Sequence, residues 1–170
     1  MAAKNKKSPP KDAEGPLRLI VAGPEGWRDG TVARLKPDKR FVIAEKIEAD
    51  FNGVELARVT PGDVLVSTVD PGFPSPAIKL ATALQKKMHG VAVVFVLPEM
   101  FRDELDIFEE YRHVWTLVST ETGEDPDTFA EVVWSASRGM VWIDLEMSRR
   151  LNDVRAVGAR SSITVAGFEE

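Results

Sequence analysis

The residues from Val91 to Leu97 (VAVVFVL) form an apolar run in which polar and apolar side chains do not alternate. A strand with one solvated face alternates, whereas a strand covered on both faces does not. The run is also far shorter than the roughly 20 residues that a membrane-spanning helix needs. We therefore expect it to be a central strand of a parallel sheet that has helices on both faces.

Four further apolar runs predict the remaining strands, at 17–22, 41–44, 63–69 and 114–118. Helical patterns separate them, at 27–36, 51–59, 75–90, 101–112 and 125–140. The last pattern has one apolar face, made of Phe129, Val132, Val133, Ala136 and Met140. Because parallel neighbours need crossover helices, this alternation predicts an α/β, flavodoxin-like fold. We expect a three-layer α/β/α sandwich whose five-stranded parallel sheet has the order 2-1-3-4-5.

The length of 170 residues suits one domain with a core of its own. We expect residues 1–16 to be a flexible leader and residues 17–153 to form the domain. Residues 154–170 would be a tail, an added strand or a linker. Within the domain an extra C-terminal helix would follow Asp144, which can cap it, and would bury Met147 and Leu151.

Composition excludes several classes of function. The absence of cysteine excludes disulfides and thiolate metal sites, and the net charge of −5 lacks the basic footprint of a nucleic-acid binder. The lysines of the leader are expected to be solvated. No stretch is apolar enough for membrane insertion or for a secretion signal, so the expected compartment is the cytoplasm.

Four short motifs occur in a fixed order along the predicted domain. They are 28–30 (RDG) in the first helix, 49–57 (ADFNGVELA) in the second, 60–66 (TPGDVLV) before the third strand, and 125–129 (DPDTF) through 137–139 (SRG) in the last helix. In this order and spacing the chain resembles the receiver domain of bacterial two-component response regulators. The likeness is greatest to the nitrate-regulator subfamily, and it covers about residues 17–153.

The resemblance implies positions for phosphoryl transfer, and the chemistry is missing from them. The family holds Mg²⁺ with two acidic residues after strand one and uses an aspartate after strand three as the nucleophile, because charge developing on phosphorus must be neutralised. Here the acidic pair falls on Ala22 and Gly23, and the nucleophile falls on Thr68 or its neighbour Ser67. The hydroxyl that the family carries on strand four falls on Leu97.

The family also places a lysine on strand five. The last lysine of this chain is Lys87, which lies before that strand, so the cation is absent whatever the alignment. The resemblance therefore implies a degenerate receiver, or pseudo-receiver, that is no enzyme and has no cofactor and no metal.

One alternative keeps a ligand at the carboxyl ends of the strands, where open α/β sheets bind their ligands. Glu25, Asp70 and Glu99 fall in the strand-end loops and would form a displaced acidic cluster for a divalent ion, a small ligand or an enzyme's substrate. The other interpretation is that they are ordinary solvated carboxylates. Neither histidine, His89 or His113, is predicted to be a catalytic base, since both stand at helix ends.

Exposed apolar side chains indicate where a partner binds. On a helical wheel Trp134 lies about 140° from the centre of the apolar face of its helix. Ile107 also stands off the buried face of its own helix, and Tyr111 follows it. We expect a homodimer, or a contact with an unidentified protein, through the fourth helix, the fifth strand and the fifth helix. Alternatively, the sixth helix or the tail covers Trp134 within one monomer.

The expected function is therefore a signalling or localisation module. The 17 residues after Asp153 are too few for a helix-turn-helix domain, so direct contact with DNA is not expected. A more specific interpretation is that the chain resembles the atypical receiver of pilus-assembly ATPases of the CpaE/TadZ type, a family with a role in polar localisation. The ATPase domain would then be missing, and 162–165 would belong to its linker.

Overall fold

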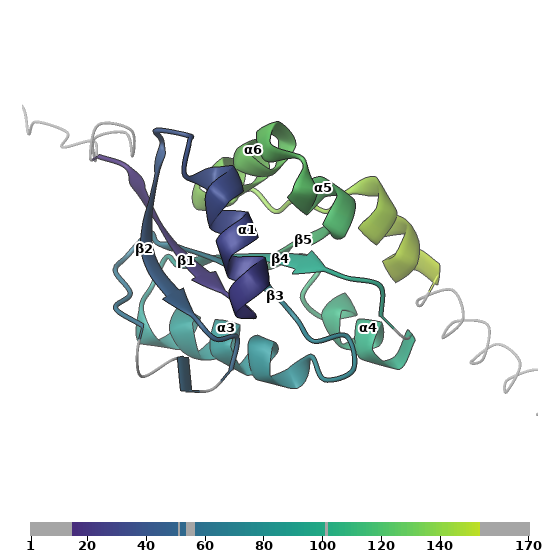
Figure 1. Cartoon of the computed structure of the whole chain (residues 1–170). Coiled ribbons are helices and arrows are strands. Elements are labelled where there is room, and N and C mark those ends of the chain that lie inside the picture. The colour runs from purple at the N-terminus through teal and green to yellow at the C-terminus, as the bar shows by residue number, and fades with distance from the viewer. Residues whose placement is uncertain (1–14, 51, 54–56, 101, 154–170) are drawn as a thin grey trace, which may run out of the picture.

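The computed structural model describes residues 15–50, 52–53, 57–100 and 102–153 (Figure 1). A helix at 145–153 ends the described part. Before it, in chain order, the elements are β1 (Leu17–Ala22), α1 (Glu25–Leu35), β2 (Phe41–Ile47), β3 (Val64–Thr68), α3 (Ser75–Lys87), β4 (Ala92–Leu97), α4 (Arg102–Glu109), β5 (Thr116–Ser119), α5 (Thr120–Glu124) and α6 (Pro126–Ser137).

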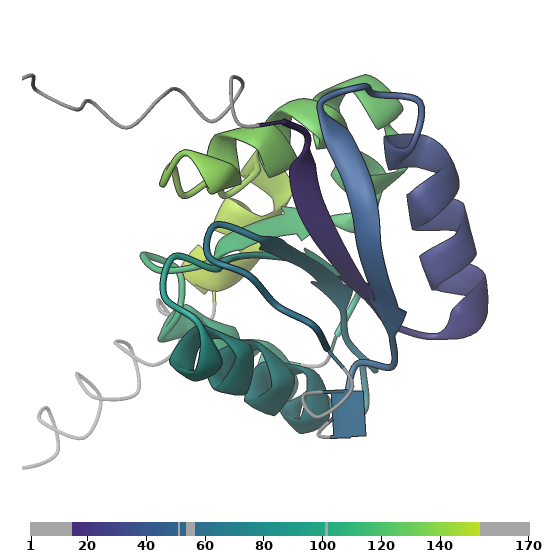
Figure 2. The same cartoon turned by 90° about the vertical axis from the view of Figure 1, so that its left-hand side faces the viewer.

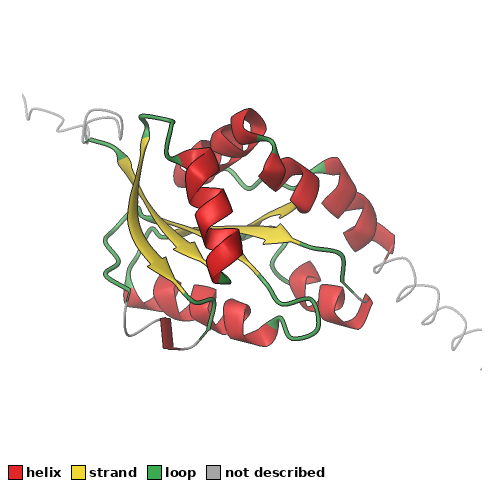
Figure 3. Cartoon of the chain, in the orientation of Figure 1, coloured by secondary structure: helices red, strands yellow, loops and turns green. Residues whose placement is uncertain are grey.

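The strands form one parallel sheet in the order β2-β1-β3-β4-β5, seen as the yellow layer of Figure 3. This order confirms the predicted flavodoxin-like architecture. The register between β1 and β2 shifts once, between Leu19 and Ile20. No helix in the described ranges has the length and the apolar character needed to cross a membrane.

Helices cover both faces of the sheet (Figure 2). On one face α1 and α6 pack over a core that includes Val94 and Val96. On the other face α3, α4 and the helix at 145–153 pack over a core that includes Phe95 and Leu97. Consecutive side chains of β4 thus enter opposite cores. None of the four residues from 94 to 97 is more than 3% exposed. This explains why the run from 91 to 97 does not alternate.

The added C-terminal helix is confirmed in its described part. The backbone N–H of Met147 donates to Oδ1 of Asp144 at 2.8 Å, which makes Asp144 the predicted cap. The side chains of Met147 and Leu151 are completely buried, on the same face of the sheet as α3 and α4.

Just before this helix, the chain runs along the free edge of β5. Ile143 forms a parallel bridge with Leu117, whose N–H donates to the carbonyl of Trp142 at 2.9 Å. The sequence did not predict this pairing, because a bridge of one residue leaves no periodic pattern.

Some predicted boundaries were wrong. The helix expected to reach Met140 ends as α6 at Ser137, and Gly139 then adopts a φ of 83° that favours glycine. Met140 consequently lies beyond the helix and is 60% exposed instead of buried. Of the helix predicted at 51–59, residues 51 and 54–56 lie outside the described residues, and 57–60 are not helical. The short helix α5 was not predicted.

Candidate functional site

The positions at which the receiver family carries its phosphoryl chemistry come together at the carboxyl edge of the sheet. β1 ends at Ala22, β3 at Thr68 and β4 at Leu97. Thr68 is paired with Val96 of β4, and Leu97 is paired with Ser119 at the end of β5. All of these side chains are buried. The sequence thus placed these positions on adjacent strand ends, and the side chains there are neutral.

The indole of Trp27, from the first turn of α1, packs against this edge at Gly23. A Cβ built on Gly23 would stand 2.7 Å from Cε3 of Trp27 and 3.1 Å from Cγ2 of Thr68. Carbon atoms in contact prefer about 3.5–4.0 Å, so no side chain fits at Gly23 while Trp27 stays in place. An acidic residue, which the family has in this region, would have to displace the indole.

The hydroxyl groups at the end of β3 are already engaged. Thr68 donates to the carbonyl of Val96 at 2.9 Å, and Ser67 donates to the carbonyl of Thr68 at 2.9 Å. Each hydroxyl is buried and bonded to a backbone carbonyl, and neither of these bonds is to a general base. A serine or threonine needs an adjacent base to act as a nucleophile, so this arrangement does not favour nucleophilic attack.

The unpredicted helix α5 covers the neighbouring strand end. A Cβ on Gly123 would lie 2.8 Å from Cγ1 of Val96, which shows how closely α5 approaches β4. Ser119 caps α5 by accepting from the N–H of Thr122. Trp27 therefore lies over the ends of β1 and β3, and α5 lies over the end of the adjacent strand β4.

The acidic residues expected to line a ligand crevice are not gathered into a site. Glu25 begins α1, and Oδ1 of Asp70 accepts from the N–H of Gly72 at 2.9 Å within its own turn. The side chain of Glu99 is 95% exposed and lies 4.0 Å from Arg150. Within the described ranges no group of three or more histidine or acidic residues is arranged to bind a metal ion.

Asp144 organises the end of β5, the strand on which the family carries its lysine. One carboxylate oxygen accepts from the N–H of Ser119 at 2.7 Å, the hydroxyl of Ser119 at 2.8 Å and the hydroxyl of Thr122 at 2.6 Å. The other oxygen accepts from the N–H of Met147. Partial burial acts to raise the pKa of Asp144, but these hydrogen bonds outweigh it and lower the pKa below its ordinary value.

This carboxylate is therefore a clamp that joins β5, α5 and the last helix. From the sequence only the capping role of Asp144 is predicted, since Ser119 and Thr122 stand more than twenty residues away. A hollow of about 290 Å³ lies beside it, lined by Ser119, Glu121, Thr122, Asp144, Leu145, Glu146 and Arg149.

The residues predicted for an interaction face separate into two places. Ile107 on α4 is 36% exposed, and Tyr111 stacks on Trp115 with ring centroids 4.0 Å apart. Both belong to the side of the molecule where α4 lies. Trp134 instead packs against the core under α1 and α6.

Trp134 points towards the start of β2, the other edge of the sheet. Its ring lies 5.2 Å from the guanidinium carbon of Arg40 and 4.7 Å from that of Arg138, in cation–π geometry. Hydrogen bonds from Arg40 to Asp38 and Glu131 raise the pKa of the Arg40 guanidinium. The structure thus does not bring Trp134 to Ile107. The described helix at 145–153 packs on the opposite face of the sheet and does not cover Trp134, whose ring is flanked by Arg40 and Arg138 instead.

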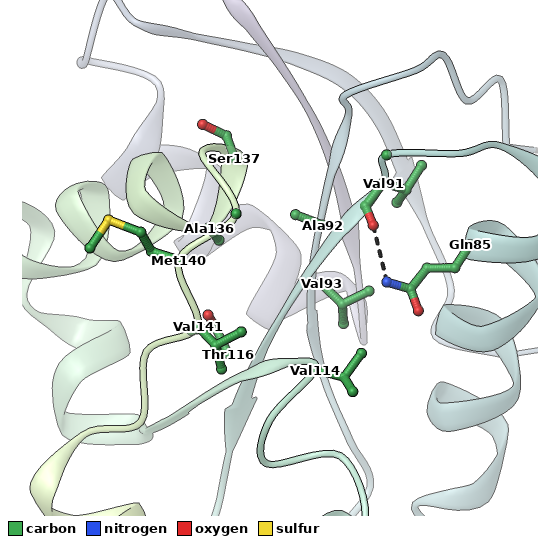
Figure 4. A pocket seen from close by; sticks show the side chains of 12 residues that line it. Gln85, Val91, Ala92, Val93, Val114, Thr116, Ala136, Ser137, Met140 and Val141 are labelled. Atoms are coloured by element: carbon green, nitrogen blue, oxygen red, sulfur yellow. Dashed lines mark hydrogen bonds between the residues drawn. The ribbon is translucent and has the colours of Figure 1, made fainter.

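A larger hollow, of about 380 Å³, lies near the start of β4 (Figure 4). Gln85 donates to the carbonyl of Val91 at 3.0 Å there, and accepts from the indole N–H of Trp115. The hydroxyl of Thr116 accepts from the N–H of Trp142. The polar groups around the hollow are thus bonded internally, and much of the lining is apolar: Val91, Ala92, Val93, Val114, Ala136, Met140 and Val141.

The similarity of this chain to known proteins lies in its fold. No family model matches the chain. No curated protein matches it either. Among solved structures the chain is similar to response regulators, which gives it a receiver-type fold.

Two of these structures are similar over most of the chain. A two-component response regulator of the LuxR family from Aurantimonas sp. SI85-9A1 aligns with a TM-score of 0.64 and 12% identity, over 84% of this chain and 99% of that one. The response regulator RcsB of Salmonella typhimurium aligns with a TM-score of 0.61 and 12% identity, over 80% of this chain and 69% of that one. At such identity the likeness concerns the fold alone.

Proposed function

We propose that this chain is a pseudo-receiver, a receiver-like signalling module of the cytoplasm that acts by binding another protein and is not switched by phosphorylation. The observation that carries the proposal is the packing of Trp27 on Gly23 beside Thr68. The place of the acidic metal ligands is filled by an indole. A receiver domain without its metal and phosphorylation site can still use its fold to bind another protein.

Charge supports the same conclusion. Transfer of a phosphoryl group to a carboxylate requires a metal ion and a cation near the transferred group. Mg²⁺ in turn requires oxygen ligands, which Ala22 and Gly23 do not offer from their side chains. The acidic residues nearby are exposed: Glu25 begins α1, and Asp70 and Glu99 lie in the loops after β3 and β4.

Calorimetric titration of the whole chain tests this proposal. We expect no saturable heat with Mg²⁺, Mn²⁺, acetyl phosphate or common nucleotides. Saturable binding that disappears in Glu25→Gln or Asp70→Asn would contradict the proposal. It would favour the alternative of an ion sensor, a ligand sensor or an enzyme with its site at the strand ends. Binding unchanged in those variants would contradict the proposal too, because a ligand site would then exist elsewhere.

The proposal includes self-association on the side of α4 and β5, which carries Ile107 and Tyr111. Trp134 lies at the other edge of the sheet and would serve a separate contact. A role in polar localisation, as in the pilus-assembly type, would require an ATPase partner. If the chain has this role, we expect such an ATPase to co-purify with the tagged chain. Replacing Trp134 or Ile107 by aspartate should abolish the co-purification.

A further inference from the structure

Five apolar side chains are exposed at the edge of the sheet formed by β5: Val114 just before β5, and four in the segment 140–145, which pairs with β5 through Ile143. The exposed fractions are 59% for Val114, 60% for Met140, 44% for Val141, 42% for Trp142 and 75% for Leu145. We refer to these five residues as the β5-edge patch. Isolated exposed apolar residues are ordinary, but several together mark a contact surface.

The backbone beside the patch has unused hydrogen-bonding groups. Leu117 of β5 donates to the carbonyl of Trp142 and accepts from the N–H of Asp144 at 3.4 Å. Peptide groups alternate in direction along a strand, so the N–H and C=O of Ile143, between these two, point away from β5. Neither group has a hydrogen-bond partner within the described ranges. An open edge of this kind is a template for another strand.

We propose that the β5-edge patch binds a second copy of this chain, with the segments 141–145 of the two copies running antiparallel across a two-fold axis. Ile143 of each copy then donates its N–H to the carbonyl of the other Ile143, as in a hydrogen-bonded antiparallel pair. The two sheets become continuous through this contact.

Charge favours a second copy as the occupant. A two-fold contact brings the same surface of both molecules together, so any outward charge would meet itself. Asp144 is the one charged residue from 139 to 145, and its carboxylate is turned inward to Ser119, Thr122 and Met147. The remaining side chains of the segment are apolar, so the segment can face its own copy without repulsion.

The patch supplies more than half of the area that a stable dimer needs. With ordinary areas of about 150–250 Å² for large apolar side chains, the exposed fractions amount to roughly 500 Å². A stable interface needs about 800 Å² from each partner, part of which comes from backbone and rim. The hollow of about 380 Å³ borders Val114, Met140 and Val141 and offers room for a side chain of the other copy. This inference rests on the proposed function and moves its self-association surface from Ile107 and Tyr111 to the β5-edge patch, which begins at Val114, three residues after Tyr111.

Light scattering of the full chain tests the inference. We expect a mass of twice the 18.8 kDa chain for the natural sequence and of one chain for Leu145→Asp. Leu145 directly follows the cap Asp144, and an acidic residue in the first turn of a helix is favoured by the helix dipole, so this variant should fold. The matched control is Phe73→Asp, which changes another exposed apolar side chain, 64% exposed in the loop after β3, and should remain dimeric.

Amide hydrogen exchange supplies the second measurement. The amide of Ile143 should exchange slowly in the dimer and fast in Leu145→Asp. A monomeric natural chain overturns the inference, and so does a dimer whose mass Leu145→Asp leaves unchanged, because the interface would then lie elsewhere. The inference is also overturned if the Ile143 amide is protected from exchange in a monomer and loses that protection when residues 154–170 are removed. That result would show that the tail occupies the edge. None of these outcomes alters the calorimetric test, so failures of the two proposals remain distinct.

Discussion

At the scale of single residues, the contact between Gly23 and Trp27 determines what this edge of the sheet can hold. Gly23→Ala places a methyl group 2.7 Å from the indole and 3.1 Å from Thr68. Overpacking of this kind costs about 1–3 kcal/mol, so we expect the free energy of unfolding to fall by that amount. Urea denaturation followed by circular dichroism measures it.

Gly30→Ala is the matched control. Gly30 lies inside α1, and an added Cβ would meet only the end of the flexible Arg34 side chain, at 3.4 Å. Alanine is favoured over glycine within a helix by about 0.5–1 kcal/mol, so this variant should be slightly more stable. If Gly23→Ala were as harmless as Gly30→Ala, the closed strand end described above would be disproved.

The clamp at Asp144 predicts a pH dependence. Its pKa in the folded chain lies below the ordinary value of 3.8, so the ionised carboxylate stabilises the fold above that value, and this stability disappears as the pH falls through the lower, folded-state pKa. Asp144→Asn should lower the free energy of unfolding by about 1–3 kcal/mol near pH 7. The difference between variant and natural chain should shrink below about pH 4.

Chemical denaturation at a series of pH values measures this difference. Asp106→Asn, in an exposed position of α4, serves as the control and should change stability little at any pH. A loss in Asp144→Asn that stayed constant down to the most acidic pH would show that the carboxylate charge is not what stabilises the clamp.

At the scale of elements, the helix at 145–153 is part of the core. Met147→Ala removes a completely buried side chain from the layer shared with α3 and α4, and should cost about 2–5 kcal/mol of unfolding free energy. Arg149→Ala, on the exposed side of the same helix, should cost little. Thermal unfolding of both variants makes the comparison. Equal midpoints would show that this helix does not belong to the domain.

Elements with a clear local signal were predicted from sequence, and elements without one were not. β4 and the capped last helix followed from an unbroken apolar run and from Asp144, Met147 and Leu151. Helix α5 has only five residues, and the residue that it buries is Gly123, so it has no apolar helical period to detect. The bridge at Ile143 arises from tertiary pairing with β5, which local sequence does not record.

At the scale of the whole molecule, the sequence predicted which strand ends come together but not the side chain that packs on them. The parallel topology brought the ends of β1, β3 and β4 together as predicted. The packing of Trp27 on Gly23 depends on how α1 lies on the sheet, which its weak amphipathic pattern does not specify. The direction of Trp134 was likewise decided by Arg40, a residue 94 positions earlier in the chain.

Under the proposed function this receiver-like molecule does not accept a phosphoryl group. Intact-mass spectrometry of the full chain after incubation with acetyl phosphate and Mg²⁺ tests it most directly, with amide NMR spectra recorded on the same samples. We predict an unchanged mass and unchanged amide signals for Gly23, Thr68 and Asp70. A gain of one phosphoryl group, with shifted signals at these three residues, would contradict the account.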